Sequence, residues 1–132
     1  ESSYNKGTKL LDENQLLQAE ESFNKSLNID PSFAPAIQGL SKLYLHKGDL
    51  KKANEYAIKA VQADEDFRDW SGKISKISEH IQNGNRNVQQ GLYDDAIKEY
   101  DAILSSHPYF PDAEFYKGLT RFRQKKKFRI DD

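Results

Sequence analysis

The chain has 132 residues, of which 36% are hydrophobic and 11% aromatic, so we expect one folded domain and exclude a disordered chain, which would lack such anchors. The 20 Lys and Arg residues almost balance the 21 Asp and Glu residues, so no overall charge favours nucleic acid or an anionic membrane as a partner. The lack of cysteine excludes disulfides and cysteine-ligated zinc, and no run approaches the roughly 20 apolar residues that span a bilayer.

The first predicted pair of helices covers about residues 1–33. In its second helix, Ala19, Phe23 and Leu27 recur at spacings of four, which places them on one buried helical face. Pro31 follows the end of this helix, because a residue without an N–H cannot continue it.

The same pattern returns 34 residues later, over about residues 34–67. Each matched pair keeps its large apolar, small apolar or acidic character: Leu10 with Tyr44, Leu16 with Leu50, Ala19 with Ala53, Leu27 with Val61 and Asp30 with Asp64. A period of 34 residues is the length of a helix–turn–helix repeat.

A third copy follows after a longer interval, over about residues 68–110. Its second helix begins at Ala96, 43 residues after Ala53, and continues through Tyr100 to Pro108 beyond its end. The additional residues lie in a stretch whose apolar or small members are spaced by three and four: Phe67, Trp70, Ile74, Ile77, Ile81, Gly84 and Val88. We therefore expect one long helix from about Asp66 to Gln90.

The opening helix of a fourth copy is predicted over about residues 111–132. This helix carries recurring apolar residues, Phe115, Leu119, Phe122 and Phe128, and no second helix follows to cover them. We therefore expect either that the native protein continues beyond Asp132 or that these residues contact another chain. The basic run Lys125–Lys127 is predicted to be a solvated turn after this helix, with contact to phosphate or an acidic partner as the alternative.

These residues resemble the tetratricopeptide repeat family, whose pattern runs W-x2-L-G-x2-Y, then A-x3-F, then P. The resemblance implies an all-α, right-handed superhelical stack of about three and a half repeats in a single domain, residues 1–132, with an extended first helix in the third repeat. It also implies a concave groove that binds a protein or an extended peptide. The long helix is similar as well to the repeat region of the Hsp40 co-chaperones of the ER lumen.

The resemblance also implies which residues line the groove. In the family they lie one and five places after the tryptophan position of each first helix. Carried onto this chain, they are Tyr4 and Thr8 in the first repeat, Gln38, Lys42 and, one turn further, His46 in the second, Gln82, Arg86 and Gln89 in the third, and Tyr116, Thr120 and Arg123 in the fourth.

The implied groove is mildly basic, because Lys42, Arg86 and Arg123 are spaced along it. It favours a peptide with acidic groups, since guanidinium–carboxylate pairs are strong hydrogen bonds; a merely solvated inner face is the alternative. Family members that hold the C-terminal tails of Hsp70 and Hsp90 use a clamp of Lys, Asn and Arg. At the matching positions here only Arg86 fits, so we do not expect such a tail to bind.

Trp70 and Ile74, near the start of the long helix, allow two interpretations. Either they pack on the last helix of the second repeat or on a missing neighbour, or they form an exposed apolar contact for a partner.

No residue pattern predicts catalysis, a cofactor or a metal site. His46, His80 and His107 lack the spacing of four that binds zinc on a helix, and no glycine-rich phosphate loop is present. We therefore expect a protein-binding adaptor, scaffold or co-chaperone-like domain, not an enzyme. The alternative is a structural module that self-associates through the long helix and the open C-terminal face. Without a visible signal peptide the cytoplasm is the default compartment, and the ER lumen is the alternative.

Overall fold

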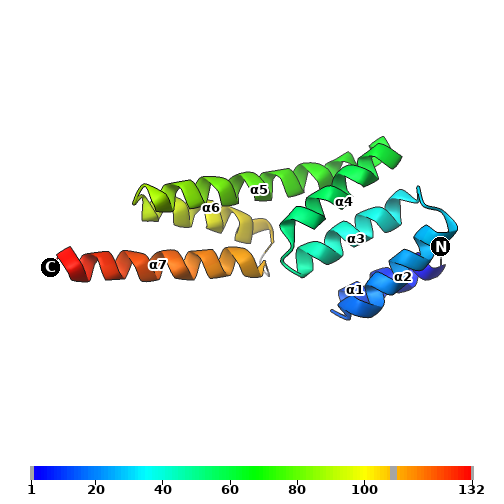
Figure 1. Ribbon diagram of the computed structural model, residues 1–132, viewed down its shortest axis with the longest axis horizontal. Helices are drawn as coiled ribbons and strands as arrows, with labels where there is room; N and C mark the ends of the chain where they lie inside the picture. The colour runs from blue at the N-terminus through cyan, green and yellow to red at the C-terminus, as the bar shows by residue number, and fades with distance from the viewer. Residues whose placement is uncertain (1, 108–109, 132) are drawn as a thin grey trace. The chain divides into compact units, whose positions relative to one another are not determined.

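Helices make up the regular structure of the chain. The computed structural model describes the backbone of residues 2–107 and 110–131 and the side chains of residues 3–107 and 110–127 (Figure 1). No strand occurs in these residues, so the predicted all-α class is confirmed. The elements are, in chain order, α1 (Ser2–Asp12), α2 (Leu16–Ile29), α3 (Ala34–His46), α4 (Leu50–Ala63), a 3₁₀ turn η1 (Glu65–Phe67), α5 (Arg68–Gln89), α6 (Tyr93–Ser106) and α7 (Pro111–Asp131).

Three of the turns between helices share one backbone geometry, and this geometry marks the repeat. Asn14, Gly48 and Gly91 have φ angles of 60°, 79° and 75°, a region that glycine and asparagine adopt most readily. In each turn the next N–H donates to a carbonyl five residues earlier: Gln15 to Leu10 at 2.8 Å, Asp49 to Tyr44 at 2.9 Å and Leu92 to Asn87 at 2.8 Å. These bonds satisfy the last carbonyls of each helix. The three turns lie 34 and 43 residues apart, which are the two intervals between repeats that the sequence predicts.

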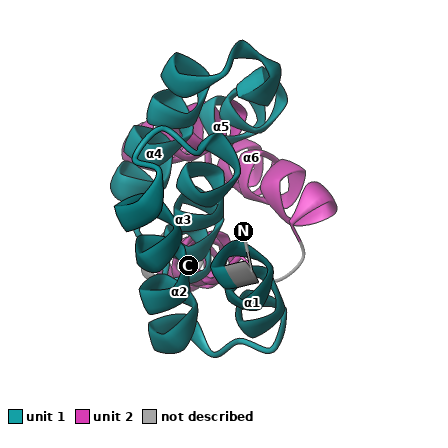
Figure 2. Ribbon diagram, turned by 90° about the vertical axis from the view of Figure 1, so that its right-hand side faces the viewer, with its two compact units in different colours: residues 1–75 teal, residues 76–132 magenta. Residues whose placement is uncertain are grey.

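The first of two compact units comprises residues 1–75 (Figure 2, teal). Within it α1 packs on α2, α2 on α3 and α3 on α4. Phe23 of α2 is fully buried, and α1 and α3 both approach its ring where Gly7 and Gly39 have no side chain. A Cβ atom on these glycines would lie 2.7 Å and 2.6 Å from Cε1 of the ring. Burial of one phenylalanine stabilises a fold by roughly 1.5–3 kcal/mol, so this ring is a main anchor of the unit.

The second unit comprises residues 76–132 (Figure 2, magenta). Here α6 packs on α7, and Tyr100 of α6 is buried in the same manner as Phe23. Gly84 of α5 faces the Tyr100 ring, and a Cβ atom there would lie 2.5 Å from its Cε1. The other buried apolar residues of this unit are Ile77, Ala96, Ile103, Phe110 and Ala113.

The predicted long helix is confirmed as α5, which has 22 residues and is about 33 Å long at 1.5 Å per residue. It begins at Arg68, slightly later than expected. The 3₁₀ turn η1 precedes it, and the Asp64 carboxylate accepts a hydrogen bond from the Asp66 N–H at 2.9 Å. The division between the two units falls inside this helix, after Ser75.

The prediction of an exposed apolar contact at Trp70 and Ile74 is wrong for Ile74, which has no exposed surface. Trp70 is half-buried against α3: its indole N–H donates to the Ser41 hydroxyl at 2.8 Å, and the Lys42 ammonium lies 5.2 Å from the ring centre. The Ser41 hydroxyl in turn donates to the Ala53 carbonyl at 2.6 Å. Trp70 thus contacts the first helix of the second repeat, and the opening turns of α5 belong to the first unit.

The expected turn at Lys125–Lys127 is also wrong, because these residues continue α7. Lysine is a good helix former, and neither glycine nor proline interrupts the run. Pro108 and the Phe128 side chain lie outside the described residues. Among the described helices, none is both long enough and apolar enough to cross a membrane.

Candidate functional site

The groove residues expected in the first repeat lie on α1. Thr8 donates its hydroxyl hydrogen bond to the Tyr4 carbonyl at 3.2 Å. The Tyr4 ring packs edge-on against Phe33 at 5.7 Å between centres and lies 6.1 Å from the Phe23 ring. Both side chains are half-buried, and Tyr4 is mainly part of the apolar core.

The groove residues expected in the second repeat lie one turn apart along α3. Gln38 and Lys42 are half-buried and His46 is exposed. The contact between Lys42 and the Trp70 ring holds its charge beside α5. In both repeats, assignment to a groove remains a prediction.

The second unit contains a hollow of about 260 Å³ that brings several of the expected residues together. Three helices contribute to it, because side chains of α5 and α7 lie beside Tyr100 of α6. The lining residues are Asn85, Val88, Gln89, Tyr100, Tyr116, Leu119, Thr120 and Arg123. Gln89, Tyr116, Thr120 and Arg123 were all expected in the groove from the sequence.

Tyr100 fixes the floor of this hollow. Its hydroxyl donates to the Asn85 side-chain carbonyl at 2.7 Å, and its ring stacks on Tyr116 with centres 5.7 Å apart and planes 27° apart. Burial raises the pKa of Tyr100, so the hydroxyl remains a donor further into the alkaline range than an exposed tyrosine does. Phe115 continues the aromatic row, with its ring centre 5.8 Å from that of Tyr116.

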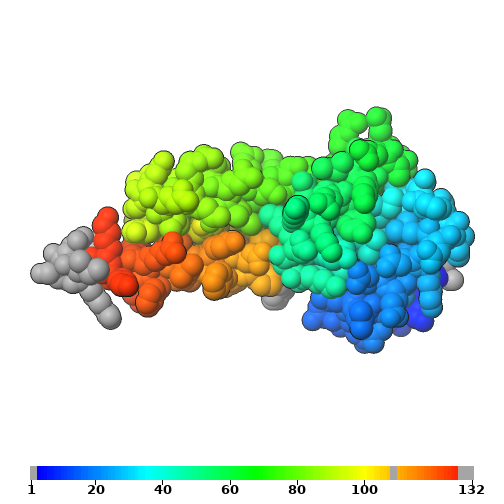
Figure 3. Space-filling model, in the orientation of Figure 1, coloured from blue at the N-terminus to red at the C-terminus, as the bar shows by residue number. Residues whose placement is uncertain are grey.

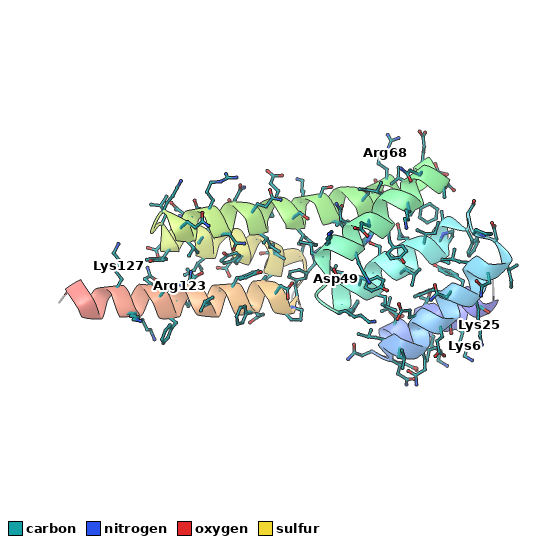
Figure 4. All side chains as sticks on the ribbon, in the orientation of Figure 1. Lys6, Lys25, Asp49, Arg68, Arg123 and Lys127 are labelled. Carbon is teal, nitrogen blue, oxygen red and sulfur yellow. The ribbon has the colours of Figure 1, made fainter. Side chains whose placement is uncertain are left out.

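The charge of the hollow is positive. Among its described lining residues only Arg123, labelled on α7 in Figure 4, is charged. No described carboxylate forms an ion pair with it. Gln89 and Asn85 add side-chain amides, while Val88 and Leu119 add apolar wall. The buried Thr120 hydroxyl donates to the Tyr116 carbonyl at 2.7 Å, so that donor is already used within α7.

The α5 side of the hollow differs by one residue from the expected register. Gln82 and Arg86 are exposed and do not line it, and the Arg86 guanidinium instead lies 3.5 Å from the Asn83 side-chain carbonyl. Asn85, which the sequence reasoning missed, occupies the wall. The sequence does contain a pattern that predicts Asn85, because Gly84 precedes Tyr100 by 16 residues, just as Gly7 precedes Phe23. Aligning the repeats on this glycine–ring pair selects Asn85.

A second hollow, of about 370 Å³, lies at the turn between α5 and α6. It is lined by Gly91, Leu92, Tyr93, Asp94, Asp95, Gln124 and Lys127. The Gln124 amide donates to the Asp94 carboxylate at 3.0 Å, and the Lys127 ammonium lies 5.9 Å from the Tyr93 ring centre. These polar groups largely satisfy one another, which makes the smaller hollow the better candidate for a partner.

Among the described residues, no group of three or more His, Asp or Glu side chains is placed to hold a metal ion. His80 is instead paired with Glu99, with 2.6 Å between Nδ1 and the carboxylate oxygen.

Repeated helix pairs, each closed by the same left-handed turn and packed around a ring that faces a glycine, define a helical repeat protein. Residues 10–77, just over half of the chain, match the sequence model of the tetratricopeptide repeat, and the chain belongs to this family. Repeats of this family mediate protein–protein interactions and are not catalytic.

The chain is also similar to DnaJ homolog subfamily C member 3 of Gallus gallus, at 23% identity over 79 residues. That match covers 58% of this chain and 16% of the length of the relative.

Proposed function

We propose that this chain is a non-catalytic protein-binding domain that holds an extended segment of a partner across its first helices, with one acidic side chain of that segment in the hollow of the second unit. The observation that carries the proposal is the lining of that hollow, which combines one cation and two amides with no anion among its described residues. Within the first unit, Tyr4, Thr8, Gln38, Lys42 and His46 remain the proposed contacts for a partner.

The chemistry of the hollow suits a carboxylate better than a cofactor. Its volume of about 260 Å³ is below the roughly 300 Å³ at which small-molecule sites begin, and is closer to the space for a side chain. The Arg123 guanidinium would pair with the carboxylate, and a hydrogen bond to a charged group contributes about 1.5–3 kcal/mol. Val88 and Leu119 would contact the methylene groups of the same side chain.

The similarity to a DnaJ homolog supports a co-chaperone-like use of this groove. A C-terminal tail of Hsp70 or Hsp90 is still not the expected ligand. Arg86, the one residue that matched the clamp, does not line the hollow, and Asn85 stands there instead.

The test uses a fluorescein-labelled flexible peptide of Gly, Ser and Asp residues, compared with the same peptide carrying Asn in place of Asp. We expect fluorescence anisotropy to show that the Asp peptide binds at least ~10-fold more tightly, a difference of about 1.4 kcal/mol. Arg123→Glu should remove this preference. Arg86→Glu is the matched control, since it reverses the same charge on an exposed residue that does not line the hollow.

Two results would overturn the proposal. Equal binding of the Asp and Asn peptides would show that the site does not select a carboxylate. Equal weakening by Arg86→Glu and Arg123→Glu would show that the preference comes from the general charge of the unit and not from the hollow.

A further inference from the structure

The larger of the two hollows, of about 370 Å³ at the turn between α5 and α6, differs from the smaller one in charge. Its lining includes the Asp94 and Asp95 carboxylates from the first turn of α6, together with the Lys127 ammonium. In Figure 3 the α5–α6 turn (yellow-green) lies beside the described end of α7 (red), which contributes Gln124 and Lys127. Two carboxylates against one ammonium leave this hollow with a net negative charge, opposite to that of the smaller hollow.

The two carboxylates differ in what they contact. Asp94 accepts a hydrogen bond from the Gln124 amide at 3.0 Å. The Asp95 side chain is exposed and forms no hydrogen bond and no ion pair with any described residue. The helix dipole favours acidic residues at the start of α6, so the pair of carboxylates alone does not indicate a ligand.

The indication of a ligand comes from Lys127, which already places a cation in this hollow. Its ammonium lies 5.9 Å from the centre of the Tyr93 ring and 3.8 Å from the place of a Cβ atom on Gly91. In Figure 4 the labelled Lys127 side chain points from α7 toward the α5–α6 turn. The ammonium forms no ion pair with a described carboxylate, and a contact between a cation and a ring is weak where it is exposed to water. A cation that reached both Tyr93 and Asp95 would therefore bind more tightly than Lys127 does.

Arginine is the side chain that fits these two groups best. A planar guanidinium stacks on an aromatic ring and also donates two parallel hydrogen bonds to a carboxylate, whereas an ammonium is a point charge. Leu92, which lines the same hollow and is 46% exposed, would contact the methylene groups of the arginine.

We propose that the larger hollow binds an arginine side chain of the partner, which displaces Lys127 from the Tyr93 ring and pairs with Asp95. The inference rests on the proposed function, because this arginine belongs to the segment whose acidic side chain occupies the smaller hollow. Arg123 and Lys127, one in each hollow, are roughly 6 Å apart along α7. Two residues of an extended chain cover about the same distance, and their side chains lie on the same side. The partner segment therefore carries an acidic residue and an arginine two positions apart.

The probe is a fluorescein-labelled flexible peptide of Gly and Ser residues with Asp and Arg two positions apart, the Asp–Arg peptide. The Asp–Gln peptide has Gln in place of Arg, and the Asn–Arg peptide has Asn in place of Asp. We expect fluorescence anisotropy to show that the whole chain binds the Asp–Arg peptide at least ~10-fold more tightly than the Asp–Gln peptide.

The decisive variant is Asp95→Asn, which should remove the advantage of the Asp–Arg peptide over the Asp–Gln peptide. Glu114→Gln is its matched control. Glu114 is also an exposed acidic residue in the first turn of a helix of the second unit, but it lines neither hollow. The control should leave the advantage unchanged.

A second pair of variants tests the displacement of Lys127. Lys127→Gln removes the cation that competes for the Tyr93 ring, so it should increase the advantage of the Asp–Arg peptide by a further ~3-fold. Lys126→Gln removes the same charge from an exposed neighbour that does not line the hollow. An effect of overall charge would be equal in these two variants, and we expect a larger effect for Lys127→Gln.

The Asn–Arg peptide allows the two proposals to fail separately, because it lacks the acidic group that the smaller hollow requires. If its binding is weakened by Asp95→Asn, the larger hollow binds arginine even where the Asp–Gln peptide does not bind at all. If instead the Asp–Gln peptide binds and depends on Arg123, while Arg adds nothing, the smaller hollow is supported and this inference is wrong.

Three results would overturn the inference. The Asp–Arg and Asp–Gln peptides could bind equally well, or Asp95→Asn and Glu114→Gln could reduce the advantage of arginine by the same factor. Equal effects of Lys127→Gln and Lys126→Gln would show that arginine does not take the place of Lys127 on the ring.

Discussion

The closest contact between backbone and ring in the second unit gives a sharp stability prediction for Gly84→Ala. The new Cβ atom would lie 2.5 Å from Cε1 and 2.7 Å from Cζ of Tyr100. The ring cannot easily move away, because it is buried, stacked on Tyr116 and held by its hydroxyl to Asn85 at 2.7 Å. Overpacking of this kind costs about 1–3 kcal/mol, while alanine recovers up to ~1 kcal/mol of helix propensity.

We therefore expect Gly84→Ala to lower the free energy of unfolding by ~1–2 kcal/mol. Urea unfolding followed by circular dichroism at the helix band measures this, with Gly118→Ala as the control. The control has the same gain in propensity and no clash, so it should be unchanged or more stable by up to ~1 kcal/mol. If Gly84→Ala proves as stable as Gly118→Ala, the packing of Tyr100 against α5 described above is incorrect.

Three further predictions concern the first unit and the hollow. Trp70→Phe, which keeps an aromatic ring but removes the indole N–H donor to Ser41 and part of the packed ring, should cost at least about 1 kcal/mol in urea unfolding; no loss would mean that neither contact contributes. Tyr44 donates to Glu20 at 2.6 Å, and this bond raises the pKa of Tyr44 to about 12 in the folded chain. Because the unfolded tyrosine ionises near 10, stability should fall between pH 10 and about 12, and Tyr44→Phe should show a smaller fall. Asn85→Leu should weaken the Asp peptide by freeing the Tyr100 ring, and unchanged affinity would contradict that role.

Much of the fold follows from local patterns in the sequence. Helix pairs are predictable because apolar residues spaced by three and four define one buried face, and the turns because asparagine or glycine is needed where φ is positive. The long α5 helix is predictable for the same reason, since its apolar stripe continues without a turn signal.

The sequence does not predict the structure where neighbouring helical positions carry side chains of similar polarity. Periodicity places Ile74 on a face but does not say whether another helix covers that face, and the structure buries it. In the third repeat, Gln82 and Arg86 are as polar as Asn85 and Gln89, so polarity alone does not predict which of them line the hollow. Only the packing of Gly84 on the Tyr100 ring distinguishes the two faces. By charge alone, the run Lys125–Lys127 fits a turn as well as a helix. The high helix propensity of lysine favours the helix that the structure has there.

We expect the hollow beside Tyr100 to hold an acidic side chain of a partner, and the side-chain amides of Asn85 and Gln89 would report on its binding directly. In a ¹⁵N–¹H correlation spectrum their NH₂ signals, and the Arg123 Nε–H signal, should shift on titration with the flexible Asp peptide. The Gln82 NH₂ and the Arg86 Nε–H signals should not move. Shifts at Gln82 and Arg86 without shifts at Asn85 and Gln89 would contradict the claim.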